Sequence, residues 1–176
     1  MKIEYLIQEE DFLKYQLFTA SKSERINRKK RNGWIGLTIG SLLFALYFYN
    51  SDKDFLTYYF VVVAMITGLF YPKYFKWRYK KHYRTYIKEN YKNRFNESAQ
   101  LEFTPEYIES KDKTGEGKIK TSELKEISET SDHFFVKLST GMSLIIPKKE
   151  FSDLNQLRGQ LEQLNIPIKD ELNWEW

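Results

Sequence analysis

The chain contains no cysteine and only two histidines, His82 and His133. Without cysteine it has no disulfide bond, no thiolate metal site and no thiol nucleophile. Neither histidine has a second histidine or a carboxylate at metal-ligand spacing, and HExxH, P-loop and GxGxxG motifs are missing as well. We therefore expect no cofactor, no metal ion and no enzymatic activity. We expect both histidines to lie at the surface, His133 in a hairpin turn.

Charged residues are absent from two long apolar segments, 33–49 and 55–71, which are separated only by the polar run 50–54. A helix rises about 1.5 Å per residue, so about 20 apolar residues cross the hydrocarbon core of a bilayer. The alternative is a soluble protein with a buried helical hairpin, but buried helices of soluble proteins seldom remain uncharged over this length. The sequence therefore predicts a transmembrane helical hairpin.

Basic residues flank the predicted hairpin on both sides, whereas its turn carries one lysine and two aspartates. By the positive-inside rule, both termini are expected in the cytoplasm, as in a multi-pass protein of the plasma (inner) membrane. We expect the flanking residues to contact anionic lipid head groups of the bilayer, at roughly 1 kcal/mol each. These residues are Arg28, Lys29, Lys30, Arg31, Lys73, Lys76, Arg78, Lys80 and Lys81. Nucleic-acid binding is not expected, because the membrane topology already accounts for the basic charge.

Small residues recur four apart in both apolar segments, Gly36 and Gly40 in the first, Ala64 and Gly68 in the second. Such spacing forms a groove that lets two helices approach closely. An antiparallel pair with a turn centred near residue 52 places Gly36 at the depth of Gly68. The same pairing places Gly40 at the depth of Ala64, so we predict that these residues form the seam between the two helices. The alternative is a dimer contact through Gly36 and Gly40, and the oligomeric state stays open.

The character of the sequence divides the chain into four regions. They are an N-terminal strand and basic amphipathic helix at 1–31, the hairpin at 32–74 with helices at 33–50 and 55–72, a basic aromatic helix at 75–97, and an α+β domain at 98–176. In the third region aromatic residues recur at three- and four-residue steps and line one helical face. This face either lies in the membrane interface or packs on the N-terminal helix.

From residue 99 onward, apolar and polar residues alternate, as in β-strands with one buried face. Expected strands lie near 101–103, 107–108, 119, 124–127, 134–139 and 142–146. Pro147 ends the last strand, and apolar residues then recur at helical spacing from Lys148 to Leu164. The expected fold class is an α+β membrane protein, in which a cytoplasmic antiparallel sheet is capped by a C-terminal helix.

Three runs in this last region stand out: Ile119 to Thr130, Phe134 to Leu138, and Ile145 to Phe151. They resemble the YcxB-like family of bacterial membrane proteins and, more loosely, bacterial pleckstrin-homology-like domains. In those proteins a strand with the pattern "I…I.E" precedes a hairpin whose second strand ends in "IPK..F" and enters the C-terminal helix. The resemblance implies two membrane helices and a cytoplasmic pleckstrin-homology-like domain. The family has no assigned activity, so it supplies no catalytic residues.

Two function classes follow from these features. The first is a membrane-anchored, non-enzymatic interaction or regulatory module, whose domain binds a cytoplasmic or membrane protein, for example through a sheet edge. The second is an immunity or self-protection protein that opposes a membrane-active peptide or bacteriocin. An enzyme with a site that no motif reveals is the least favoured alternative. We hypothesise the first.

Overall fold

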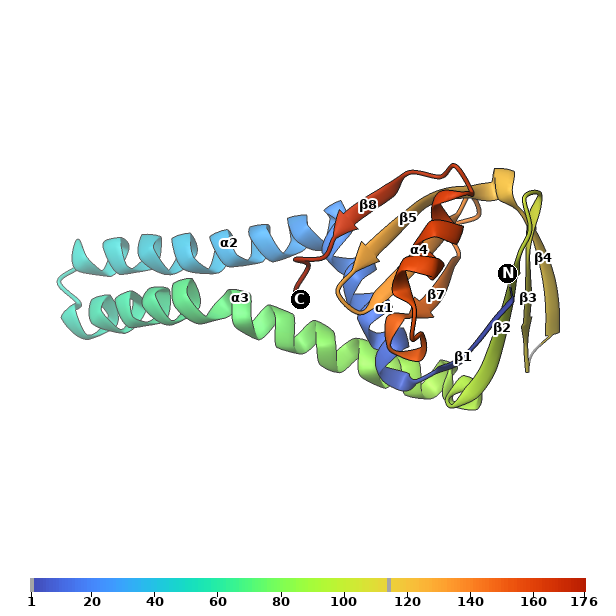
Figure 1. The fold of residues 1–176 in the computed structure, drawn as a ribbon. Helices are drawn as coiled ribbons and strands as arrows, with labels where there is room; N and C mark the ends of the chain where they lie inside the picture. Colours follow the sequence, from blue (N-terminus) through green and yellow to red (C-terminus); the bar gives the residue numbers. More distant parts are fainter. Residues whose placement is uncertain (1, 114) are drawn as a thin grey trace. The chain divides into compact units, whose positions relative to one another are not determined.

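The computed structural model describes residues 2–113 and 115–176 (Figure 1). The chain forms two compact units. The boundaries between them fall after Gln16 and after Arg84, each inside a helix, and so differ from the boundaries of the four sequence regions. The sheet unit comprises Met1–Gln16 and Thr85–Glu175, and the hairpin unit comprises Leu17–Arg84 and Trp176. Each unit is described by itself.

The first sheet of the sheet unit is antiparallel throughout, in the order β1-β2-β3-β4. Its strands are β1 (Lys2–Ile7), β2 (Glu97–Phe103), β3 (Tyr107–Asp112) and β4 (Gly115–Lys120). Buried and exposed residues alternate along β1, as expected for a strand with one face on the core. The predicted N-terminal strand is therefore confirmed, and it pairs with β2 from a distant part of the chain.

The second sheet has the order β7-β6-β5-β8. Its strands are β5 (Leu124–Thr130), β6 (His133–Leu138), β7 (Ser143–Pro147) and β8 (Ile168–Glu171). Strand β8 runs parallel to β5, whereas the other pairs are antiparallel. The sequence did not predict β8, because this strand has four residues and no fully buried position, which leaves no alternation to detect.

Helix α4 (Leu154–Glu162) is shorter than the predicted helix from Lys148 to Leu164. It begins after Asp153, whose carboxylate caps it by accepting a hydrogen bond from the Gln156 N–H at 2.9 Å. Three short 3-10 helices complete the unit: η1 (Lys92–Arg94), η2 (Thr121–Glu123) and η3 (Lys148–Glu150).

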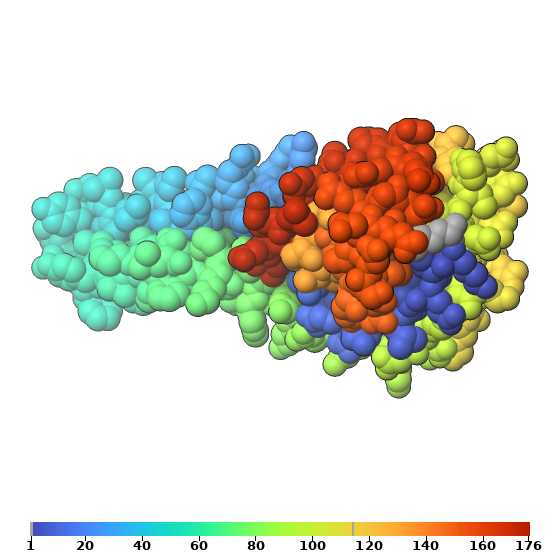
Figure 2. Space-filling model, viewed as in Figure 1, coloured from blue at the N-terminus to red at the C-terminus, as the bar shows by residue number. Residues whose placement is uncertain are grey.

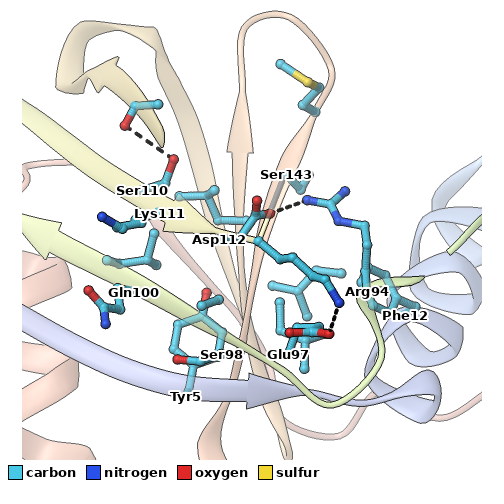
Figure 3. A pocket seen from close by; sticks show the side chains of 18 of the residues that line it. Tyr5, Phe12, Arg94, Glu97, Ser98, Gln100, Ser110, Lys111, Asp112 and Ser143 are labelled. Atoms are coloured by element: carbon cyan, nitrogen blue, oxygen red, sulfur yellow. Dashed lines mark hydrogen bonds and ion pairs between the residues drawn. The ribbon is translucent and has the colours of Figure 1, made fainter. Parts of the chain in front are cut away.

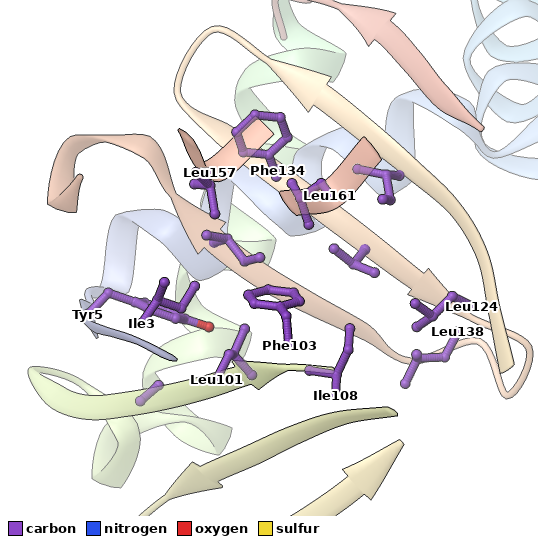
Figure 4. Close-up of a cluster of buried hydrophobic side chains, with 14 residues drawn as sticks. Ile3, Tyr5, Leu101, Phe103, Ile108, Leu124, Phe134, Leu138, Leu157 and Leu161 are labelled. Atoms are coloured by element: carbon purple, nitrogen blue, oxygen red, sulfur yellow. The ribbon is translucent and has the colours of Figure 1, made fainter. Parts of the chain in front are cut away.

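One hydrophobic core joins both sheets and α4. Figure 4 shows Leu157 and Leu161 of α4 beside Phe134 of β6, with Phe103 and Ile108 of the first sheet below them. Leu157 and Leu161 are fully buried. The predicted α+β arrangement, in which a C-terminal helix covers an apolar sheet face, is thus present, with two sheets where one was expected.

The hairpin unit contains α2 (Glu24–Tyr49) and most of α3 (Asp54–Asn90), which lie side by side (Figures 1 and 2). The preceding helix α1 (Glu9–Lys22) begins in the sheet unit and ends in the hairpin unit. Ser23 separates α1 from α2, and its hydroxyl caps α2 by accepting from the Ile26 N–H. The region 75–97 is not a separate helix. Residues 75–90 belong to α3, which runs through Pro72 to Asn90, and η1 follows.

Candidate functional site

Helices α2 and α3 contact each other through aromatic, hydroxyl and small side chains. Trp34 Nε1 donates a hydrogen bond to the Gly68 carbonyl at 3.0 Å, and the hydroxyls of Thr38 and Thr67 lie 3.4 Å apart. Near the turn, Phe48 and Phe60 stack with ring centroids 5.6 Å apart. The contact stripe of α2 therefore follows positions 34, 38, 41, 45 and 48, which include the buried Ser41 and Ala45.

The four residues of the predicted seam do not come together. Ala64 is buried and Gly68 receives the Trp34 hydrogen bond, so both lie on the contact face of α3. A Cβ atom added at Gly36 or Gly40 would meet no described atom within 4 Å. At 3.6 residues per turn, these two glycines lie on the side of α2 opposite the contact stripe. Trp34, the Thr38–Thr67 pair and the stacked Phe48 and Phe60 join the two helices in place of a glycine groove on α2.

The apolar surface of α2 and α3 is largely uncovered. Only 11% of the most apolar stretch of α2 and 6% of that of α3 is buried, and both helices are long enough to cross a membrane. The exposed fraction reaches 62% at Leu43 and 75% at Leu69. All nine basic residues predicted to contact lipid lie on α2 or α3, and all except the half-buried Lys30 are exposed.

The C-terminal end of the aromatic face of region 75–97 packs on the N-terminal helix α1. Phe12 of α1 contacts Tyr91 and Phe95, with ring centroids 4.9 and 6.1 Å apart. Ile87 and Leu13 are fully buried in the same unit. The sequence left open whether this aromatic face lies in the membrane interface or packs on the N-terminal helix. Its C-terminal end packs on the helix.

The prediction that His133 lies at the surface is wrong. His133 is 2% exposed, and its Nε2 lies 3.0 Å from Oδ1 of Asp11, which is 3% exposed. Asp11 also accepts a hydrogen bond from the Gln8 N–H at 2.8 Å, and Lys149 Nζ lies 3.3 Å from both carboxylate oxygens. Sequence reasoning missed this pairing, because Asp11 and His133 are 122 residues apart and no spacing links them. His82, in contrast, is exposed as predicted.

Burial acts to raise the pKa of Asp11, but the hydrogen bonds from His133 and Gln8 and the charge of Lys149 outweigh it. The net result is a pKa below the usual range of an aspartate. The cluster of Asp11, His133, Lys149 and Gln8 fastens the first turn of α1 to β6 and η3. Asp11 and His133 are closed off from solvent, so the arrangement is that of a structural clamp.

A second buried ion pair lies next to the core. Lys148 donates to Glu129 at 2.8 Å, and both side chains are 9% exposed. Arg158 of α4 approaches the other Glu129 oxygen at 3.6 Å, and the Lys148 ammonium lies over the Phe134 ring. The two lysines that follow Pro147 therefore each bind a buried carboxylate, Lys148 that of Glu129 and Lys149 that of Asp11.

The sheet unit also contains a cavity of about 490 Å³ between α1, the first sheet and β7 (Figure 3). Its wall is mostly apolar and includes Ile7, Phe12, Leu101, Leu144 and Ile145. This volume lies within the range of small-ligand and peptide side-chain pockets.

Two ion pairs border the cavity. Arg94 of η1 binds Asp112 at the end of β3, and Figure 3 shows the two side chains pointing toward each other. Lys113 binds Glu97 of β2 at 2.5 Å. Two further lining cations, Lys111 and Lys118, are paired with carboxylates that do not line the cavity, those of Glu116 and Glu109. The cavity lining therefore carries four cations and two carboxylates, and each of the four cations is paired with a carboxylate.

Tyr5 is the most unusual residue of the cavity wall. The residue as a whole is 4% exposed, and its hydroxyl, which is not among the fully buried atoms without a partner, forms no hydrogen bond with the described residues. Burial and the nearby charge of Asp112 raise the pKa of this phenol, so it remains a protonated donor. The alternation along β1 accounts for the burial of Tyr5 but carries no signal for the unused hydroxyl.

Comparison with known proteins identifies the C-terminal part of the chain. Residues 103–161 match the family described as "YcxB-like protein". No curated protein and no solved structure matches the chain. The matched residues run from the end of β2 to the last turn of α4 and contain the three runs on which the resemblance rests. The resemblance of this region to the YcxB-like family is therefore confirmed.

Proposed function

We propose that this protein is a membrane-anchored, non-enzymatic interaction module of the bacterial plasma membrane. In this proposal α2 and the first part of α3 span the bilayer, and the sheet unit is a cytoplasmic, pleckstrin-homology-like domain that binds a protein partner. The observation that carries the proposal is the uncovered apolar surface of the two helices.

The size of that surface argues for a membrane. Thirteen exposed aliphatic, methionine or phenylalanine side chains lie between residues 35 and 70, each with 41% to 82% of its surface accessible. Full burial of one such side chain contributes about 1.5–3 kcal/mol, so leaving these in water forfeits on the order of 10–20 kcal/mol. That cost equals or exceeds the whole folding stability of a typical domain, about 5–15 kcal/mol. A hydrocarbon environment removes it.

The polar ends of the helices support the proposed orientation. Basic residues 28–31 precede the apolar stretch of α2, and five basic residues, Lys73, Lys76, Arg78, Lys80 and Lys81, follow that of α3. The connecting turn carries one lysine and two aspartates. The positive-inside rule favours a cytoplasmic location for these basic residues, and this supports the proposed contact with anionic head groups.

The geometry of the sheet unit favours binding over catalysis. Asp11 and His133 have the side chains of a catalytic pair, but both are buried and neither lines the cavity. The pleckstrin-homology-like assignment of this proposal is supported by two four-stranded sheets that share one core with α4.

Cysteine labelling tests the anchoring and the orientation, since the chain contains no native cysteine. Single cysteines replace the exposed Ser51 in the turn and the exposed Ser122 in η2, and intact cells are treated with a membrane-impermeant thiol reagent. We expect labelling at position 51 only, with position 122 labelled after the cells are opened. The buried Ser128→Cys variant serves as the control that reacts only after denaturation. Labelling at position 122 in intact cells would contradict the proposed topology.

A further inference from the structure

We propose that the cavity and the outer edge of β7 together bind an extended apolar peptide segment of a protein partner, which adds to the second sheet as a further strand. This inference rests on the proposed function and specifies where the partner binds.

The hydrogen-bond pattern of β7 leaves one edge open. The Leu138 N–H donates to the Met142 carbonyl, and the Lys148 N–H donates to the Asp132 carbonyl, so even-numbered residues of this segment bond to β6. In an antiparallel pair the residues between them direct their backbone groups to the opposite side. Ser143 and Ile145 therefore turn their N–H and C=O groups away from β6, and β7 is the last strand of its sheet.

The open edge borders the cavity. Ser143, Leu144 and Ile145 all line it, together with Leu101 and Ile119 of the first sheet. A strand paired with β7 would place alternate side chains in this mostly apolar space. Backbone pairing supplies affinity in such strand addition, and the pockets for alternate side chains supply specificity.

The Tyr5 hydroxyl provides the second, independent observation. Tyr5 is 4% exposed and lines the cavity, and among the described residues its hydroxyl forms no hydrogen bond, so it can donate to an acceptor that a ligand supplies. The carbonyl groups of a peptide are acceptors of this kind. The Tyr5 ring is held in place by Phe151, at 6.1 Å between centroids, which keeps the hydroxyl fixed.

Charge at the mouth disfavours the other ligand class that a cavity of this size accepts, a small amphiphilic anion. The four lining cations are all paired, Arg94 with Asp112, Lys113 with Glu97, Lys111 with Glu116 and Lys118 with Glu109, so an anion would have to displace a carboxylate from one of them. An uncharged peptide backbone requires no such exchange. An extended segment with one or two large apolar side chains satisfies both the open edge and the free hydroxyl.

The test uses the full chain in lipid nanodiscs and a phage-displayed library of random twelve-residue peptides. Enriched sequences are synthesised with a fluorescent label, and their affinities are measured by fluorescence anisotropy. We expect enriched peptides with large apolar residues at alternate positions. Methylation of a peptide N–H that pairs with β7 should weaken binding about three- to tenfold, the factor for one lost hydrogen bond.

Variants of the protein assign the site. Tyr5→Phe removes the hydroxyl and keeps the ring, and Ser143→Pro removes an outward N–H that the β6–β7 pairing does not use. Each should weaken binding about three- to tenfold. Tyr107→Phe is the matched control, since Tyr107 lies in the same sheet outside the cavity wall, and it should leave the affinity unchanged. Hydrogen exchange should slow at Ser143 and Ile145 when the peptide binds.

Two outcomes would overturn the inference. One is enrichment no greater than on empty nanodiscs. The other is a set of peptides whose affinity responds to neither Tyr5→Phe, Ser143→Pro nor peptide methylation, which would place binding elsewhere. Either result leaves the cysteine-labelling test of anchoring unaffected, so failure of this site and failure of the proposed function are distinguishable.

Discussion

Removal of the Asp11 carboxylate should destabilise the sheet unit far more than removal of an exposed acid. Asp11→Ala deletes the acceptor of His133 Nε2, of the Gln8 N–H and of Lys149, and it leaves His133 buried without a partner. Breaking a buried ionic contact by removing one partner costs about 3–5 kcal/mol. The matched control is Asp132→Ala, since Asp132 binds Lys14 at 2.5 Å but is 53% exposed. Such surface pairs contribute about 0–1 kcal/mol.

The thiol of a Ser128→Cys background reports the opening of the sheet unit, because Ser128 is 5% exposed and the chain has no other cysteine. The rate of its modification, relative to that of a fully accessible thiol, gives the free energy of opening. We expect Asp11→Ala to lower that free energy by about 3 kcal/mol, which corresponds to labelling more than a hundredfold faster. Equal labelling rates in the Asp11 and Asp132 variants would refute the conclusion that the buried cluster fastens α1 to the second sheet.

The same assay and a stability measurement in detergent test three further expectations. The folded-state pKa of Asp11 is lowered, so its stabilisation is complete above the unfolded-state pKa of about 4 and is lost as the pH falls further; labelling of the parent, measured relative to a fully accessible thiol at the same pH, should accelerate across that range, and an Asp11→Asn variant that responds identically would contradict the assignment. Leu157→Ala should lower the free energy of opening by about 2–5 kcal/mol, whereas Leu154→Ala on the exposed side of α4 should cost less than about 1 kcal/mol. In the hairpin, Ala64→Leu should lower the melting temperature in detergent, because Ala64 is buried. Gly36→Leu should not, since its Cβ meets open space, and the reverse order would restore the predicted glycine seam.

The clamp and the cavity share the N-terminal segment. β1 supplies Tyr5 to the cavity, and Asp11 in the first turn of α1 supplies the carboxylate of the clamp. Both residues precede the hairpin in the sequence, whereas their surroundings come from strands that follow it. The sheet unit is therefore complete only when the segment before the hairpin returns to the strands after it.

Local pattern was sufficient for much of this architecture. Two uncharged apolar segments define helices, because helix formation and exclusion from water depend on the composition of a continuous stretch. Alternation at Lys2–Ile7 and from residue 99 onward defined most strands, since a strand with one buried face repeats every two residues. The runs around Ile127, Phe134 and Ile146 carried the resemblance to the YcxB-like family that the match to residues 103–161 confirms.

Tertiary structure decided what depends on residues far apart in the chain. His133 is buried because Asp11 provides its hydrogen-bond partner. The face of α2 that contacts α3 is set by Trp34, Thr38 and their partners rather than by glycine spacing. The parallel strand β8 and the open edge of β7 exist only relative to neighbouring strands. Periodicity shows which side of an element is apolar, but the partner of that side is set by three-dimensional packing, and burial of a polar group becomes favourable only when the fold brings its partner to it.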